Sequence, residues 1–139
     1  MESWLEIRPL AEAARTTARK AEGAAWRAIV RERLGPDTEI GYNAAGAPVL
    51  TEGRGYIGVS HTRGWVAVVW SPHPCAIDIE LKTRTISAAV ATRMGIAPEI
   101  EAWCAHEATY KYRGLTGNEP EASKISYLPH PKLVVAVIR

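Results

Sequence analysis

The residues best suited to chemistry lie in two short segments, and the first contains a pair of carboxylates, Asp78 and Glu80. They belong to residues 75–81, a predicted strand, and residues two apart on a strand share a face. Ile77 and Ile79 then face the core, while both carboxylates point the other way. Magnesium takes oxygen ligands, usually one or two from protein and the rest from water and phosphates. The pair therefore predicts a cation site, with a solvent-exposed acidic strand face as the alternative.

The second segment is a predicted helix that begins at Pro98 and ends at Arg113. One side of this helix carries, at helical spacing, Ile100, Trp103, Cys104, Glu107 and Lys111. Glu107 and Lys111 thus continue an apolar stripe, whereas a glutamate and a lysine four residues apart usually form a solvated ion pair. A carboxylate in such a stripe needs a partner or a metal ion, because an unpaired buried charge is costly. The pattern favours a functional site.

Ser60 and His61 lie where a predicted strand, residues 56–60, meets a predicted loop, residues 61–64. A hydroxyl and an imidazole at a strand end can bind a phosphate, and an ordinary polar hairpin turn is the alternative. A hydrolytic serine–histidine pair is disfavoured, because adjacent residues on a strand point to opposite faces.

The N-terminal half contains a long alanine-rich helix, predicted from about Glu12 to Leu34. Its buried stripe is predicted to consist of Ala18, Ala21, Ala25, Ala28 and Ile29. The opposite side carries Lys20, Arg27 and Arg31, which could grip a phosphate or an acidic partner. A basic face that merely keeps the helix solvated is the alternative.

Composition excludes several classes of protein. The chain has 139 residues, of which 47% are hydrophobic, enough for a single domain with its own core. The net charge of +2 is too small to indicate nucleic-acid binding. The first residues carry charge and no long apolar run, so neither a signal peptide nor a membrane association is predicted. Cys75 and Cys104 lack metal-binding spacing, which predicts free thiols in a cytoplasmic protein.

The order of the predicted elements repeats once along the chain. Residues 1–72 are predicted to form a strand, a helix and a hairpin, and residues 73–139 repeat this order with less sequence. The hairpin strands 65–70 and 133–138 are close copies of one another. We therefore predict one α+β domain of two pseudo-symmetric halves, with a ligand-binding cleft between them.

Four motifs, in their order along the chain, resemble those of the 4′-phosphopantetheinyl transferases: Gly46-Ala47-Pro48, Gly58-Val59-Ser60-His61-Thr62, Ala76-Ile77-Asp78-Ile79-Glu80 and Trp103-Cys104-Ala105-His106-Glu107-Ala108-Thr109-Tyr110-Lys111. Because the first two motifs precede the third, the chain resembles the longer, pseudo-dimeric type of the family in a compact form. The resemblance spans about Arg19 to Lys111, and the closing hairpin also fits. It implies the fold of that family, with two strand-helix-hairpin halves.

The resemblance also implies an activity. Enzymes of this family transfer the 4′-phosphopantetheine arm of coenzyme A to a serine of an apo acyl or peptidyl carrier protein, and they release adenosine 3′,5′-bisphosphate. By the resemblance, Asp78, Glu80 and Glu107 would hold Mg²⁺ on the pyrophosphate. Lys111 would contact the same phosphates, and Glu107 would activate the acceptor serine as a base, directly or through water. Asp78, Glu107 and Lys111 are thus the implied catalytic residues.

The remaining contacts to coenzyme A implied by the resemblance come from the first half of the chain. Ser60 and His61 would bind its phosphates, and Gly46 and Pro48 would line the adenine pocket. Arg27 would meet the end of coenzyme A that carries the 3′-phosphate.

Two departures from the family pattern each remove a fixed positive charge near coenzyme A. Ala47 stands where lysine or arginine is usual, and His106 stands where lysine is usual. The second half is also shorter than usual. Ala47 and His106 favour the alternative of a non-catalytic relative, an interaction module that binds coenzyme A, a nucleotide or a carrier protein. A third interpretation is a metal-dependent phosphohydrolase that uses the same three carboxylates. The sequence is compatible with either a monomer or a dimer.

Overall fold

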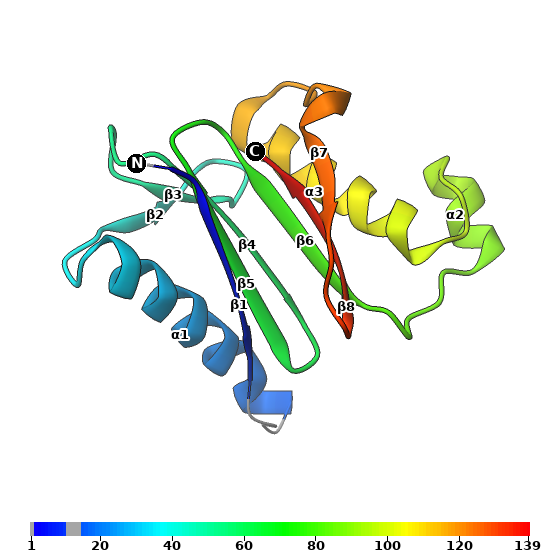
Figure 1. The fold of residues 1–139 in the computed structure, drawn as a ribbon, viewed down its shortest axis with the longest axis horizontal. Coiled ribbons are helices and arrows are strands. Elements are labelled where there is room, and N and C mark those ends of the chain that lie inside the picture. Colours follow the sequence, from blue (N-terminus) through cyan, green and yellow to red (C-terminus); the bar gives the residue numbers. More distant parts are fainter. Residues whose placement is uncertain (1, 11–14) are drawn as a thin grey trace.

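A computed structural model describes residues 2–10 and 15–139, with the side chains of the first helix described from Arg19 onward. Within these residues the chain forms two three-stranded sheets, one two-stranded sheet, three α-helices and a 3-10 turn (Figure 1). The predicted α+β class is confirmed. None of the described helices combines the length and the apolar character needed to cross a membrane.

The first sheet joins the N-terminal strand to a hairpin, in the order β1-β5-β4. Its strands are β1 (Trp4–Pro9), β4 (Tyr56–Thr62) and β5 (Trp65–Ser71). Neighbouring strands are antiparallel. The central strand β5 is buried over residues 66–71, as expected for an apolar run whose two faces are both covered.

The hairpin of β4 and β5 is tighter than the sequence suggested. Its turn consists of Arg63 and Gly64, and Gly64 has a φ of 82°, which favours glycine in a two-residue turn. Pairing therefore continues as far as Thr62, opposite Trp65. The prediction that His61 lies in the loop is wrong, because this short turn leaves it within β4.

The second sheet has the strand order β6-β8-β7 and is also antiparallel. Its strands are β6 (Ala76–Leu81), β7 (Ile125–Leu128) and β8 (Leu133–Ile138). In both sheets the second strand of a hairpin lies in the centre, between its hairpin partner and the strand that precedes them in the chain. The two sheets thus share one connectivity.

The facing edges of the two sheets are β4 and β6, which lie side by side but belong to different sheets (Figure 1). We call this line of contact, between residues 56–62 and 76–81, the seam. Gly58 permits the close approach, because a Cβ atom there would lie 3.0 Å from both Ala76 Cα and Val69 Cγ1. The seam is therefore too narrow at this point for any larger residue.

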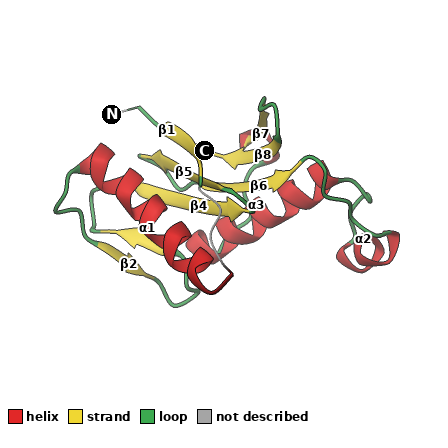
Figure 2. Cartoon of the chain, turned by 90° about the horizontal axis from the view of Figure 1, so that it is seen from below, coloured by secondary structure: helices red, strands yellow, loops and turns green. Residues whose placement is uncertain are grey.

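The three α-helices are α1 (Arg15–Leu34), α2 (Ala88–Met94) and α3 (Ile100–Thr116). Ser87 accepts a hydrogen bond from the Val90 N–H at the start of α2, and Gly95 ends this helix in the left-handed conformation. In Figures 1 and 2, α2 projects from one end of the molecule. The predicted start of the first helix near Glu12 and the side chain of Ala18 lie outside the described residues.

The smaller elements lie in the connections between the main ones. They are the strands β2 (Ile40–Tyr42) and β3 (Pro48–Leu50), which pair with each other, and the 3-10 turn (Ala122–Lys124). Asn43 closes the turn between β2 and β3, because its side-chain oxygen accepts hydrogen bonds from two backbone N–H groups, those of Ala45 and Ala47.

The core consists of three groups of side chains. Between the two sheets lie Ala67, Val69, Cys75, Ile77, Ile79, Leu133, Val135 and Val137. The contact of α1 with the first sheet contains Trp26, Ile29, Val30, Ile57, Val66, Val68 and Trp70. The contact of α3 with the second sheet contains Ala76, Ile100, Cys104, Ala108, Val134, Ala136 and Ile138. Each sheet therefore has one helix on its outer face (Figure 2).

The buried face of α1 matches the predicted stripe only in part. Ile29 is buried as predicted and Ala21 and Ala25 are half-buried, whereas Ala28 is exposed. Trp26 and Val30, which the prediction left out, are buried. A tryptophan and two β-branched residues remove more apolar area from water than a row of alanines, and this difference decides how the helix is rotated.

Candidate functional site

Asp78 and Glu80 project from β6 toward α3, and their exposed fractions are 5% and 8%. Ile77 and Ile79 face the opposite way, into the core between the sheets, as the strand pattern predicts. The alternative of a solvent-exposed acidic face is wrong, because α3 packs over this side of the second sheet. Two carboxylates buried on one strand face require compensating partners.

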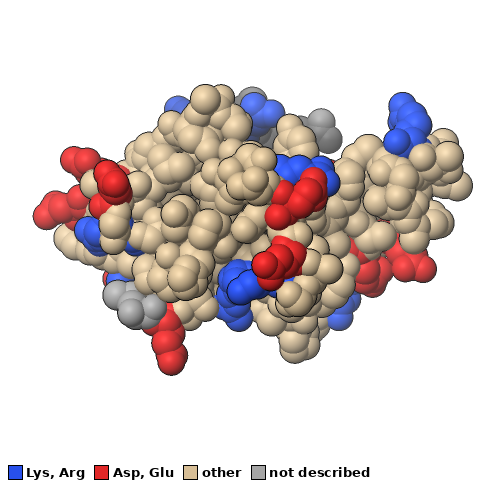
Figure 3. Space-filling model, turned by 90° about the horizontal axis from the view of Figure 1, so that it is seen from above, with Lys and Arg blue, Asp and Glu red and all other residues tan. Residues whose placement is uncertain are grey.

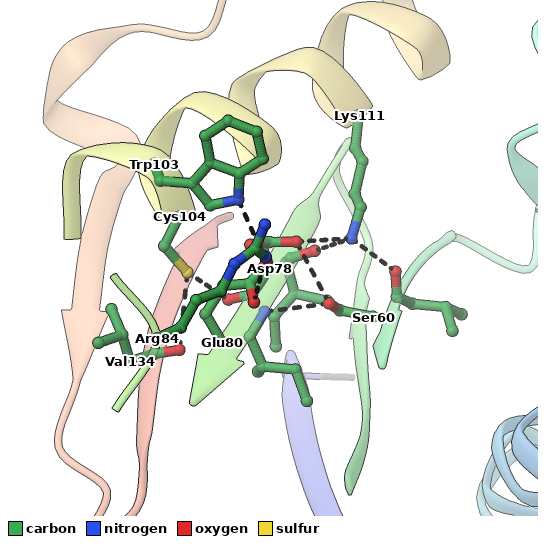
Figure 4. A network of polar contacts seen from close by, with 11 residues as sticks. Ser60, Asp78, Glu80, Arg84, Trp103, Cys104, Lys111 and Val134 are labelled. Carbon is green, nitrogen blue, oxygen red and sulfur yellow. Dashed lines mark hydrogen bonds and ion pairs between the residues drawn. The ribbon is translucent and has the colours of Figure 1, made fainter. Parts of the chain in front are cut away.

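Lys111 of α3 reaches across to the seam (Figure 4). Its Nζ donates hydrogen bonds to Val59 O at 3.2 Å, to Ile77 O at 3.0 Å and to Asp78 Oδ1 at 3.1 Å. An ammonium group has three donors, so the full capacity of this one is used within the protein. Lys111 thus links β4 to β6 through its two carbonyl contacts and also neutralises a carboxylate.

Ser60 of β4 makes a second link across the seam. Its Oγ accepts a hydrogen bond from the Ile79 N–H at 3.0 Å and donates to Asp78 Oδ1 at 3.4 Å. The adjacent His61 points to the other face of the strand, where its Nδ1 lies 3.1 Å from Glu22 Oε2 of α1. The two residues predicted to bind phosphate therefore face different surroundings.

The second oxygen of Asp78 is buried without a hydrogen-bond partner among the described residues. Burial raises the pKa of the Asp78 carboxyl and the nearby charge of Glu80 raises it further, and together these effects outweigh the lowering by Lys111. The charge of this carboxylate is therefore only partly compensated by the protein, and Oδ2 can accept a further positive partner.

Both oxygens of Glu80 have protein partners. The indole N–H of Trp103 donates to Oε1 at 3.2 Å, and Arg84 pairs with Oε2 at 2.8 Å. The Arg84 guanidinium also lies over the Trp103 ring, 5.1 Å from its centroid. Sequence reasoning missed both partners. The position of Trp103 on the same helix stripe as Glu107 and Lys111 was an available signal, whereas no sequence pattern indicated the contact of Arg84.

Glu107 lies one helical turn from both Trp103 and Lys111 on α3 and is half-buried. Among the described residues, no three His, Cys, Asp or Glu side chains are grouped closely enough to hold a metal ion. Asp78, Glu80 and Glu107 therefore come from facing elements but do not converge on one point.

A cavity of about 760 Å³ opens near the C-terminal ends of α1 and α3. Its lining includes Arg33, Pro48, Arg54, Trp70 and Leu115. Gly46 is exposed in the turn after β2 with a φ of 85° and does not line this cavity, although Pro48 does. Asp78, Glu80 and Lys111 do not line it either, so this cavity is separate from the buried carboxylates.

Arg27 differs from the other predicted members of the basic stripe. It is half-buried, donates a hydrogen bond to Tyr42 Oη and lies over the Trp26 ring at 4.6 Å. Lys20 and Arg31 are exposed. On the face drawn in Figure 3, basic and acidic side chains are interspersed and form no continuous basic surface.

The two cysteines are free and buried, as the sequence predicts. The Cys104 thiol donates a hydrogen bond to the Asp78 carbonyl at 3.0 Å and so anchors α3 to β6. Burial raises the pKa of Cys75 to about 12, and burial together with the charge of Asp78 raises the pKa of Cys104. Both thiols are therefore inert packing groups at neutral pH.

A scan against models of known protein families finds no match to this chain, and a search of curated proteins finds no similar sequence. The functional interpretation therefore depends on the motifs and on the geometry of the site itself.

Proposed function

We propose that this chain is a Mg²⁺-dependent 4′-phosphopantetheinyl transferase, which moves the phosphopantetheine arm of coenzyme A to a serine of an apo acyl or peptidyl carrier protein. The observation that carries the proposal is Asp78 Oδ2, a buried carboxylate oxygen without a partner among the described residues. It lies at the seam, next to Lys111. An unsatisfied buried charge at a junction between two halves is typical of a functional site.

The arrangement of the motifs supports the proposal. Ser60, Asp78 and Lys111 come from three separate motifs, and hydrogen bonds connect all three. The two sheets share one connectivity, and each has a helix packed on its outer face, as expected for two pseudo-symmetric halves. Motifs that are distant in the chain thus meet where the halves meet.

The chemistry of the donor set suits Mg²⁺, although the three carboxylates do not converge on one point in the described residues. Asp78, Glu80 and Glu107 are hard oxygen ligands, and phosphoryl-transfer sites usually use one or two carboxylates together with substrate phosphates. Asp78 pairs with Lys111 and Glu80 pairs with Arg84, so counting Glu107 the three carboxylates exceed these two cations by one formal negative charge. The ion, when bound, neutralises phosphate charge during transfer.

The residues of the chain have separate tasks in this proposal. Lys111 and Ser60 keep Asp78 in one orientation through their shared contacts with Oδ1. Glu107 accepts the proton of the acceptor serine, directly or through water. The serine oxygen then bonds to the phosphorus that carries the pantetheine arm, and the bond from this phosphorus to adenosine 3′,5′-bisphosphate breaks.

A non-catalytic module that binds coenzyme A or a carrier protein is the second candidate. Arg84 and Lys111 already pair with Glu80 and Asp78, and the described residues contain no ready group of three metal-ligating side chains. Ala47 and His106 also lack the fixed positive charges usual in the family. These observations favour binding without transfer.

Calorimetry with coenzyme A, in the presence and absence of Mg²⁺, tests whether there is a donor site. We expect binding that strengthens when Mg²⁺ is added, because the ion offsets repulsion between the carboxylates and the pyrophosphate. Absence of binding in both conditions would overturn the transferase and any module that binds coenzyme A.

Transfer is tested by following the mass of apo carrier proteins, with Glu107→Gln as the diagnostic variant. The matched control is Glu101→Gln, an exposed glutamate on the same helix. We expect Glu107→Gln to keep coenzyme A binding and lose transfer by about a hundredfold or more, while the control transfers like the parent. A parent protein that binds coenzyme A but modifies none of the carriers would support the interaction module.

A further inference from the structure

Arg84 is a charged residue beside the buried carboxylates to which no motif assigns a role. It follows β6 and turns back so that its Nη1 lies 2.8 Å from Glu80 Oε2. The side chain of Glu80 is 10% exposed, whereas that of Arg84 is 45% exposed. A nearly buried carboxylate is therefore paired with a guanidinium that remains in contact with solvent.

Trp103 positions both members of this pair (Figure 4). Its indole N–H donates to Glu80 Oε1, and its ring supports the guanidinium of Arg84. The flat guanidinium can move across an aromatic face while it keeps most of its cation–π attraction. Arg84 can therefore release Glu80 without leaving the neighbourhood of the carboxylates.

Lys111 is much less free to move. Its ammonium makes three hydrogen bonds at the seam, two of them to backbone carbonyls of β4 and β6. Moving it toward a ligand would leave Val59 O and Ile77 O without this donor, whereas moving Arg84 breaks one half-exposed ion pair. Of these two cations, Arg84 is therefore the easier one to redirect.

We propose that Arg84 is an exchangeable counter-ion, which pairs with Glu80 when no cation is bound and with a phosphate of the diphosphate donor when a cation is bound. This inference rests on the proposed function, because it requires a divalent cation and a diphosphate at the carboxylates. A cation would satisfy Glu80 together with the unpartnered Asp78 Oδ2. The released guanidinium can then form two parallel hydrogen bonds to phosphate, which offsets the positive charges missing at Ala47 and His106.

Arg84→Ala tests the exchange by binding measurements alone. Calorimetry first measures Mg²⁺ alone and then coenzyme A at saturating Mg²⁺. Loss of the competing guanidinium should tighten Mg²⁺ binding roughly fivefold or more, and loss of the phosphate contact should weaken coenzyme A binding by a similar factor. The two affinities thus change in opposite directions, which a purely structural role of Arg84 would not produce.

The matched control is Arg113→Ala, which removes a guanidinium that is also 45% exposed and paired with a glutamate, Glu119. It should bind both ligands like the parent.

Parent-like Mg²⁺ affinity in Arg84→Ala, or unchanged coenzyme A affinity, would overturn the exchange and leave the proposed function standing. Binding of Mg²⁺ by Arg84→Ala but not by the parent would support it. Absence of Mg²⁺ and coenzyme A binding in all three proteins would overturn the exchange and the proposed function together.

Discussion

The carboxyl group of Asp78 has two different environments at its two oxygens. Oδ1 receives hydrogen bonds from Lys111 and Ser60, and Oδ2 is buried without a partner among the described residues. Because burial raises its pKa, the folded protein holds this proton more tightly than the unfolded chain does. The stability due to this group is therefore present below the unfolded pKa of about 4 and is lost as the pH rises through the folded value. Above that value the ionised group lowers stability, while its charge is available for a cation.

Asp78→Asn should separate stability from function. The amide keeps an oxygen for Lys111 and removes the titrating charge, so the variant should gain stability relative to the parent as the pH rises. We expect the difference in unfolding free energy, measured by urea denaturation without Mg²⁺, to grow by on the order of 1 kcal/mol between about pH 4 and pH 7. A difference that shrinks with rising pH would contradict this account of Asp78.

At the scale of elements, the seam between β4 and β6 brings the motifs together. Its width depends on Gly58, whose missing side chain lets β4 approach Ala76 and Ile77. Ser60 and Lys111 can span the seam only at this close separation, because the Ser60 hydroxyl of β4 bonds directly to β6 and the Lys111 ammonium bonds to carbonyls of both strands. A wider seam would therefore loosen the contacts that orient Asp78.

Gly58→Ala should destabilise the protein by forcing the seam apart. The new methyl group would lie 3.0 Å from Val69 Cγ1 and 3.2 Å from Ile77 N, and overpacking of this kind typically costs about 1–3 kcal/mol. Gly41→Ala is the control, because its nearest contact, Val49 Cγ2, would be at an ordinary 3.7 Å. Chemical denaturation of both variants measures the effect, and equal stabilities would show that the seam can widen freely.

At the scale of the whole molecule, a second contact joins the two sheets at their hairpin turns. The ring of His130, in the connection between β7 and β8, packs edge-on against Trp65, with centroids 5.0 Å apart. His130 Nδ1 accepts hydrogen bonds from the N–H groups of Lys132 and Leu133, both at 3.1 Å. This double acceptor role requires the neutral ring. Burial and the nearby charges of Lys82 and Lys132 lower the pKa of His130 accordingly.

This contact predicts a loss of stability in mild acid. A histidine with a lowered folded pKa contributes stability that is present above the unfolded value of about 6.5 and is lost as the pH falls below it. His130→Asn keeps an acceptor oxygen and does not titrate in this range. Relative to this variant, the free energy of unfolding of the parent should fall by up to about 1 kcal/mol between pH 7 and pH 5. A flat result for His130 would exclude its titration as a source of acid lability.

Local patterns were reliable wherever backbone geometry alone decides which way a side chain points. Alternation along β6 correctly separated Asp78 and Glu80 from the isoleucines between them. Helical spacing was right only in part for α1: Ile29 is buried as predicted, but the buried face also includes Trp26, which the predicted stripe left out. His61 was misplaced because the length of a hairpin turn is decided by strand pairing, which a single strand does not reveal.

The sequence by itself determined the class of fold, the strand that carries the carboxylates and the helix face that carries Glu107 and Lys111, because these follow from periodicities of 2 and about 3.6 residues. The tertiary structure alone decided that α3 buries the carboxylates, that Lys111 spans the seam and that Arg84 pairs with Glu80. Those contacts join residues distant in the chain or depend on a turn after the strand. They exist only once the sheets and helices have packed, because hydrogen bonds and ion pairs depend on distances in space, which local sequence patterns do not encode.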